Sequence, residues 1–91
     1  MNEPKSNFVL QSNIVDTISD ELMEIGDIHS CILTVREETN QDMFMLECKT
    51  SNSWFTKEYF YEKFGQHLID AKICFELRIV YDSGDIDAYT S

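Results

Sequence analysis

Carboxylates give this sequence its clearest chemical pattern. Between positions 13 and 27 they recur three or four residues apart, at Asp16, Asp20, Glu24 and Asp27. On a helix this spacing places them on one face, at intervals of roughly 6 Å along the axis for a rise of about 1.5 Å per residue. A regular row of negative charge would attract a protein that binds a phosphate backbone, and counterion release would favour the docking.

A second acidic group surrounds Gly84 near the end of the chain and consists of Asp82, Asp85 and Asp87. These residues partly match a calcium-binding loop, but the full twelve-residue pattern and its terminal glutamate are missing. A plain β-turn is therefore the better interpretation. We assign these three acids, with the four above, to a predicted partner-binding surface.

The other reactive side chains fit no catalytic or metal-binding pattern. An acid–base pair of carboxylates needs one buried member with a raised pKa, whereas the acids here fall at helix surfaces and turns. The residues His29, His67, Cys31, Cys48 and Cys74 show no C-x-x-C or H-x-x-x-H spacing. Cys31 near His29 lacks an oxyanion hole and a third orienting group. We expect no enzyme activity, no metal and no cofactor, with the cysteines packed as thiols.

Composition narrows the class of partner. The 91 residues suffice for one small folded domain, and their hydrophobic content is 43%. Seventeen acids against seven bases give a formal net charge of −10, which argues against binding nucleic acid or an anionic membrane and favours a basic partner. The three scattered cysteines, the polar amino terminus and the lack of a long apolar run indicate a cytoplasmic protein without a membrane span.

The acid row lies on a predicted helix over residues 13–27, preceded by a flexible lead-in over residues 1–7. Ser12 or Asn13 is expected to cap this helix, and Gly26 to end it in a left-handed conformation. Its inward stripe has helical spacing and consists of Ile14, Ile18, Leu22 and Ile25, with Val15 at the edge.

Two strands should follow as a hairpin, over residues 29–37 and 43–49, joined by a polar loop. Their alternation turns Cys31, Leu33 and Val35 inward from the first strand, and Phe44, Leu46 and Cys48 from the second. Residues 73–81 form the clearest strand, and a turn at 82–85 leads to a short edge strand at 86–89. Asp87 there would discourage aggregation between sheet edges.

A second helix is predicted over residues 54–72, capped by Thr56, with Trp54 folded in at its start. Phe60, Phe64, Leu68 and Ala71 form its inward stripe. Gly65 within it costs about 1 kcal/mol relative to Ala, so either a neighbour packs closely there or the helix bends. Phe55, Tyr59 and Ile69 fall on its outer side, which suggests either a homodimer surface or a different helix rotation.

The element order predicts an α+β fold, α-β-β-α-β-(β), with two helices on one face of a mainly antiparallel sheet. In size, acidity and mixed α/β pattern, the chain resembles the small acidic DNA-mimic inhibitors of phages, including the anti-restriction-endonuclease proteins of T-even phages. That resemblance implies a homodimer whose surface carboxylates stand in for phosphates and block a host restriction endonuclease. It carries no diagnostic motif.

Two functional hypotheses follow. The first is a DNA-mimic inhibitor, active in the host bacterial cytoplasm, whose acidic surface occupies the DNA-binding site of a host protein. The second is an immunity-type or adaptor protein that recognises a basic partner by shape and hot-spot contacts, with charge steering only the encounter.

Overall fold

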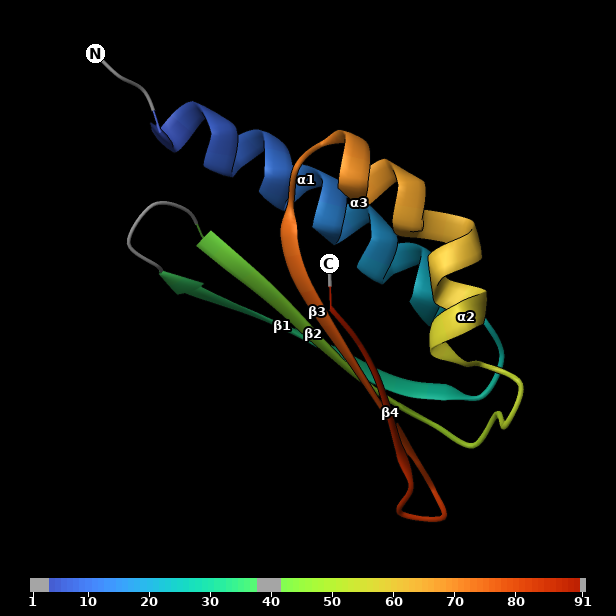
Figure 1. The fold of residues 1–91 in the computed structure, drawn as a ribbon. Coiled ribbons are helices and arrows are strands. Elements are labelled where there is room, and N and C mark those ends of the chain that lie inside the picture. The colour runs from blue at the N-terminus through green and yellow to red at the C-terminus, as the bar shows by residue number, and fades with distance from the viewer. Residues whose placement is uncertain (1–3, 38–41, 91) are drawn as a thin grey trace.

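The computed structural model describes residues 4–37 and 42–90, and for residues 4–7 only the backbone. The chain forms α1 (Pro4–Met23), β1 (Ile28–Glu37), β2 (Asp42–Thr50), a second helical segment, β3 (Cys74–Tyr81) and β4 (Ile86–Thr90). The second helical segment comprises α2 (Lys57–Phe60), the π-helical turn η1 (Tyr61–Gly65) and α3 (Gln66–Asp70). The predicted α+β fold is confirmed, because both helical segments lie over one face of the sheet (Figure 1).

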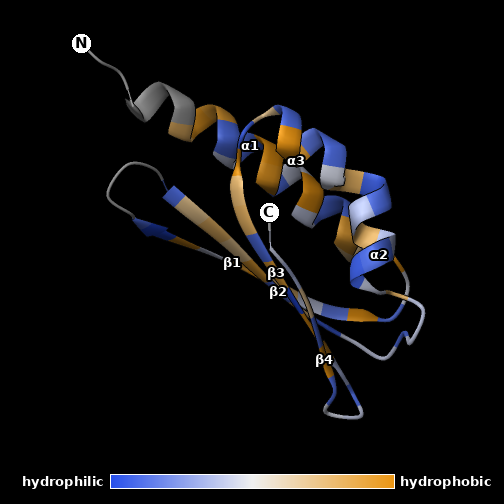
Figure 2. Cartoon of the chain, in the orientation of Figure 1, coloured by the Kyte–Doolittle hydropathy of each residue, from blue (hydrophilic) through white to orange (hydrophobic). Residues whose placement is uncertain are grey.

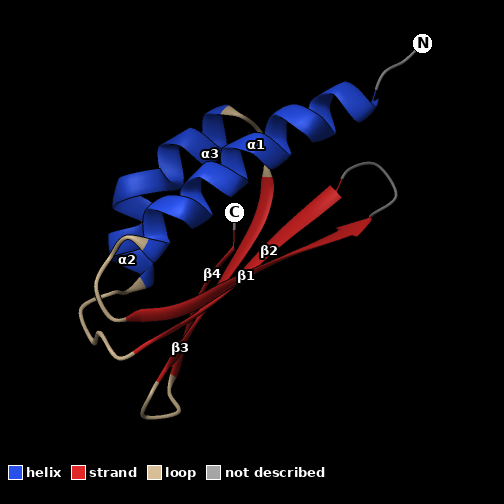
Figure 3. Ribbon diagram, turned by 180° about the vertical axis from the view of Figure 1, so that it is seen from behind, coloured by secondary structure: helices blue, strands red, loops and turns tan. Residues whose placement is uncertain are grey.

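The four strands pair in the order β1-β2-β3-β4. The β1–β2 and β3–β4 pairs are antiparallel hairpins, as predicted, whereas β2 and β3 run parallel. A parallel pair needs a crossover connection, and here the second helical segment provides it. Seen from behind, both helical segments again lie on the same side of the sheet, so its other face is uncovered by the described chain (Figure 3).

The core lies between the helices and the sheet, and both layers contain apolar residues (Figure 2). Aromatic rings provide much of the contact: Phe60 stacks on Phe75 with ring centroids 5.5 Å apart, and Phe8 stacks on Phe44 at 5.9 Å. The predicted inward residues of β2 are buried, and those of β1 are partly buried or, for Val35, 37% exposed. In β3 the inward-facing Phe75, Leu77 and Ile79 are buried, and Tyr81 is partly buried. The buried apolar residues are Val15, Ile18, Leu22, Ile28, Phe44, Leu46, Cys48, Phe55, Phe60, Phe64, Leu68, Ile73, Phe75, Leu77 and Ile79.

Helix α1 starts earlier than the sequence pattern predicts. It begins at Pro4, a residue well suited to the first helical position, so the predicted cap at Ser12 or Asn13 is wrong. Of the predicted lead-in, residues 4–7 are helical and residues 1–3 lie outside the described chain. The inward stripe is also rotated, with Val15 fully buried and Ile14 only partly. In the described part of the chain, no helix is long and apolar enough to cross a membrane.

The end of α1 departs from the prediction as well. The helix ends at Met23, and the backbone N–H groups of Glu24 and Ile25 bond to carbonyls three residues back. The left-handed residue is Asp27, with φ of 70°, and not Gly26. An aspartate tolerates this conformation better than most side chains do, so it can turn the chain into β1.

The second helical segment has the predicted cap but begins at Lys57, later than the predicted range of 54–72, and it then changes its winding. Thr56 caps α2 by accepting a hydrogen bond from the Tyr59 N–H. At Gly65 the ring of Tyr61 lies so close that an added Cβ would stand 2.4 Å from its Cδ1 atom. The close neighbour that the glycine accommodates is therefore a side chain of the same helical segment, across the wider π turn.

Candidate partner-binding surface

The predicted row of carboxylates on α1 is interrupted. Asp16 and Asp20 are exposed on the helix, but Glu24 and Asp27 lie beyond its end at Met23. The even spacing along one helix axis therefore holds only for the first two, and the predicted four-step ladder is wrong. The cause is the turn into β1, which removes Glu24 and Asp27 from the helix. Both remain exposed, at one end of the sheet.

Thr50 joins the turn after α1 to the β3–β4 hairpin. This buried residue donates its hydroxyl to the Asp27 carbonyl at 2.8 Å, and its own carbonyl accepts from the Asp82 N–H at 3.1 Å. The Ser51 N–H also donates to the Asp27 carbonyl, and the Asn52 side-chain amide donates to the Gly26 carbonyl. The turn that carries Asp27 and the hairpin that carries Asp82 thus meet at the same end of the sheet.

The β3–β4 hairpin has the predicted turn. Gly84 has a φ of 97°, its N–H donates to the Tyr81 carbonyl at 2.8 Å, and the Tyr81 N–H donates to the Asp85 carbonyl at 2.9 Å. Asp82, Asp85 and Asp87 all line one shallow hollow, together with Ser51 and Ser53 from the loop after β2. The structure therefore brings together the three acids predicted at this turn.

Asp87 differs from its neighbours because its carboxylate is used within the fold. One oxygen accepts from the Lys57 N–H at 2.9 Å, at the start of α2, and the other lies 4.0 Å from the Lys57 ammonium nitrogen. A carboxylate at this place satisfies a free N–H of the helix and interacts favourably with its dipole. We therefore remove Asp87 from the predicted partner-binding surface.

The remaining six acids keep their charge open to solvent. Asp82 lies 3.5 Å from the His29 ring nitrogen Nε2, and both side chains are more than half exposed. The other five carboxylates form no ion pair with any side chain that the structure describes. We call the six together the acidic surface: Asp16, Asp20, Glu24, Asp27, Asp82 and Asp85.

The predicted homodimer surface does not exist as one exposed face. Phe55 is fully buried, Tyr59 is partly buried against it in an edge-on ring contact, and only Ile69 is exposed, at 46%. The Phe55 carbonyl accepts a 2.6 Å hydrogen bond from the Tyr81 hydroxyl. Phe55 precedes α2 and lies in the loop, so a helix wheel placed its side chain on the wrong side.

Tyr81 holds this loop from the end of β3. Its pKa is raised above the ordinary value, first by burial and then by the negative charges of Asp87 and Glu58. The hydroxyl therefore keeps the proton that it donates to the Phe55 carbonyl.

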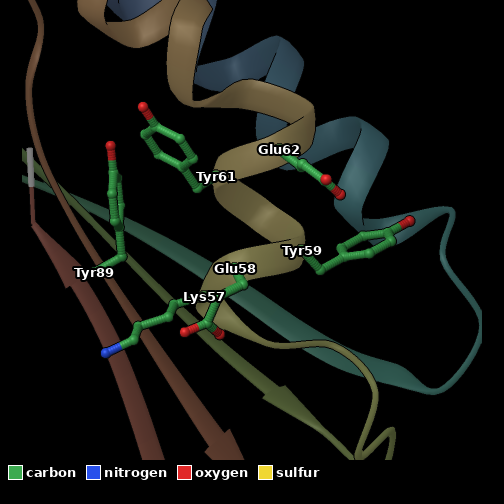
Figure 4. Close-up of a pocket in the computed structure, with 6 residues that line it drawn as sticks. All are labelled: Lys57, Glu58, Tyr59, Tyr61, Glu62 and Tyr89. Carbon is green, nitrogen blue, oxygen red and sulfur yellow. The ribbon is translucent and has the colours of Figure 1, made fainter.

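An aromatic group around α2 was missed by the sequence prediction. Trp54 was expected to fold inward, yet it is 52% exposed, with its ring edge-on to Tyr59 at 5.2 Å. On another side of the helix, Tyr61 and Tyr89 lie side by side with centroids 5.7 Å apart, beside a shallow hollow that Glu58 and Glu62 also line (Figure 4). The pairing of Tyr89 with Tyr61 could not be read from the sequence, because it joins β4 to η1.

The uncovered sheet face, unlike the acidic surface, carries more basic than acidic residues. Strand alternation and register place Arg36, Lys49 and Arg78 there, against the acids Glu47 and Glu76. Acids and lysines nearly balance in the second helical segment as well. The excess negative charge of the described chain therefore lies mainly on α1, in the turn after it and at the β3–β4 hairpin.

Neither a metal-binding group in the described chain nor a similar known protein helps to identify the function of this surface. Among the described residues, no group of three or more His, Cys, Asp and Glu side chains could hold a metal ion. Comparisons with protein-family models, with curated proteins and with solved structures found no match to this chain.

Proposed function

We propose that this protein is a non-enzymatic inhibitor that occupies the nucleic-acid-binding surface of a basic partner, such as a restriction endonuclease. The observation that carries the proposal is the acidic surface, whose carboxylates are exposed and, apart from Asp82, outside any described ion pair. Side chains whose charges are not used inside the fold are free to meet Lys and Arg on another protein. Long-range attraction between such surfaces speeds encounter and weakens with salt.

The interrupted row shapes this proposal. A partner would meet Asp16 and Asp20 along α1 and then the cluster at the end of the sheet, where Thr50 fixes the Asp27 and Asp82 backbones. The acidic surface would thus present negative charge in two places, along α1 and at the end of the sheet, and not as one straight row. This arrangement can occupy a basic groove without matching the spacing of successive phosphates.

The test compares two variants with equal loss of charge in a pull-down from bacterial lysate. One variant neutralises the acidic surface near α1, and the control neutralises acids of the β1–β2 hairpin and the uncovered sheet face. We expect the first to bind the nucleic-acid-binding partner on the order of tenfold more weakly, and the control to bind nearly as wild type. The changes are Asp16→Asn, Asp20→Asn, Glu24→Gln and Asp27→Asn against Glu37→Gln, Asp42→Asn, Glu47→Gln and Glu76→Gln.

Salt and DNA complete the experiment. Capture should fall between about 50 and about 300 mM salt, and added duplex DNA should displace the partner at low salt. Equal weakening in both variants would assign the effect to net charge and contradict a specific acidic surface. A partner that stays bound through the salt wash and the DNA challenge would contradict occupation of a DNA site.

The exposed aromatic group favours a second candidate, an immunity-type or adaptor protein. Trp54 and Tyr61 are 52% and 46% exposed, and aromatic side chains are the commonest hot spots of protein interfaces. In this case Trp54→Ala or Tyr61→Ala should weaken capture more than neutralising the acids does. Ile32→Ala is the matched control, because Ile32 is similarly exposed, at 55%, on the uncovered sheet face.

A further inference from the structure

Two of the three cysteines lie directly opposite each other across the β1–β2 hairpin. Cys31 and Cys48 are register partners, and their Sγ atoms are 3.0 Å apart. Opposite residues of antiparallel strands have Cβ atoms about 4.5–5.5 Å apart, and a disulfide needs about 3.5–4.5 Å between Cβ atoms and about 2.05 Å between sulfurs. A small approach of the two side chains would therefore suffice to join them.

The two thiols differ in access and in acidity. Cys48 is fully buried, whereas Cys31 is only partly buried, on the edge strand β1. Their hydrogen bond lowers the pKa of Cys31, and together with burial it raises the pKa of Cys48. The thiolate is the reactive form of cysteine, so the accessible member of the pair is also the better nucleophile.

We propose that Cys31 and Cys48 form a reversible oxidation site, which a small disulfide such as oxidised glutathione converts into a cross-strand disulfide. The Cys31 thiolate attacks one sulfur of oxidised glutathione, the glutathione S–S bond breaks, and one glutathione leaves. Cys48 then loses its proton and attacks Cys31 Sγ, which breaks the mixed disulfide and releases the second glutathione. Two electrons pass to the oxidant, and the two thiol protons end on two glutathione molecules.

The bond would fasten the edge strand near its start. Cys31 lies shortly after the turn that carries Asp27, and β1 has a strand partner on one side only. A disulfide stabilises mainly by restricting the unfolded chain. Oxidation would therefore raise resistance to unfolding without requiring a new arrangement of strands.

Intact-mass spectrometry of the purified protein tests the proposal. After reduction, incubation with oxidised glutathione and alkylation, wild type should lose two hydrogen atoms and leave one thiol alkylated. Peptide mapping should place the link between Cys31 and Cys48 and the alkyl group on Cys74. Cys74→Ser should behave as wild type does in forming the link, and Cys31→Ser should form none. Cys74 is the matched control because alternation places it on the uncovered sheet face, away from the pair.

Three results would overturn the proposal. They are a lasting glutathione adduct on Cys31 with Cys48 still free, a link that includes Cys74, and an unchanged melting temperature in fully linked protein. We expect the link to raise the wild-type melting temperature by about 5 °C or more and the same treatment to leave Cys31→Ser unchanged. Since Cys48 is in the core and its replacement threatens folding, Cys31→Ser is the deciding variant.

Discussion

At the scale of single residues, Thr50 decides where the predicted acids lie. It is the buried polar residue of the described core, and its hydroxyl both donates to the Asp27 carbonyl and accepts from the Asn52 N–H at 2.9 Å. Its backbone carbonyl accepts from Asp82. One residue at the end of β2 thus connects three segments: its hydroxyl joins the turn after α1 to the loop before α2, and its carbonyl holds the β3–β4 hairpin.

Replacing Thr50 by Val should therefore be costly although the shape is kept. Both hydrogen bonds of the hydroxyl are lost, and we expect the free energy of unfolding to fall by about 1–3 kcal/mol. Urea denaturation measures this change. Thr34→Val, at an exposed position of β1, is the control and should stay within about 0.5 kcal/mol of wild type. Equal effects of the two replacements would show that the hydroxyl of Thr50 contributes nothing.

At the scale of elements, the packing of the second helical segment against β4 depends on Gly65 and Tyr61. Its middle five residues, Tyr61–Gly65, wind as the π turn η1 between α2 and α3. Tyr61 packs over Gly65 and touches Tyr89 of β4, so the glycine lets the ring join the helix to the edge strand. Thr56 and Asp87 fix the start of the same segment.

Gly65→Ala should lower the free energy of unfolding of the wild-type protein and raise that of a Tyr61→Ala variant. In wild type the new Cβ would overlap the Tyr61 ring, and overpacking of about 1–3 kcal/mol outweighs the better helix propensity of Ala, about 1 kcal/mol. In a Tyr61→Ala background the overlap is gone, so the same change should stabilise by up to about 1 kcal/mol. Thermal or urea unfolding of the four proteins measures the coupling. Destabilisation of the same size in both backgrounds would rule out the ring as the cause.

At the scale of the whole molecule, charge is the dominant property. A net charge of −10 on 91 residues opposes compactness through self-repulsion, and the acidic surface contributes six of the acids. The fold tolerates this by placing these carboxylates in solvent. Exposure limits the repulsion, and it also leaves the charge available to a basic partner.

Salt should reveal this repulsion. Raising salt from about 50 to about 500 mM should raise the melting temperature of wild type, because screening weakens repulsion between exposed carboxylates. The variant with Asp16→Asn, Asp20→Asn, Glu24→Gln and Asp27→Asn should start higher at low salt and gain less. Differential scanning calorimetry gives both values. An identical salt response in the two proteins would show that these four carboxylates do not repel one another or the rest of the chain.

Much of the fold and part of the candidate site can be predicted from the sequence. The alternation of Phe44, Leu46 and Cys48 is a local property of a strand, and the Thr56 cap depends on a residue three positions away. The helix wheel failed at Phe55 because that residue lies before α2. The predicted end of α1 at residue 27 was too late because the carboxylate row continues in the sequence after the backbone has turned.

The sequence by itself determined the types and order of the elements, the inward faces of the strands and the excess of negative charge. These follow from side chains close together in the chain. Only the tertiary structure decided that Asp27 and Asp82 meet at one end of the sheet, and that Cys31 faces Cys48. The physical reason is that strand register and chain turns are set by long-range contacts, such as the bond from Thr50 to a carbonyl 23 positions earlier.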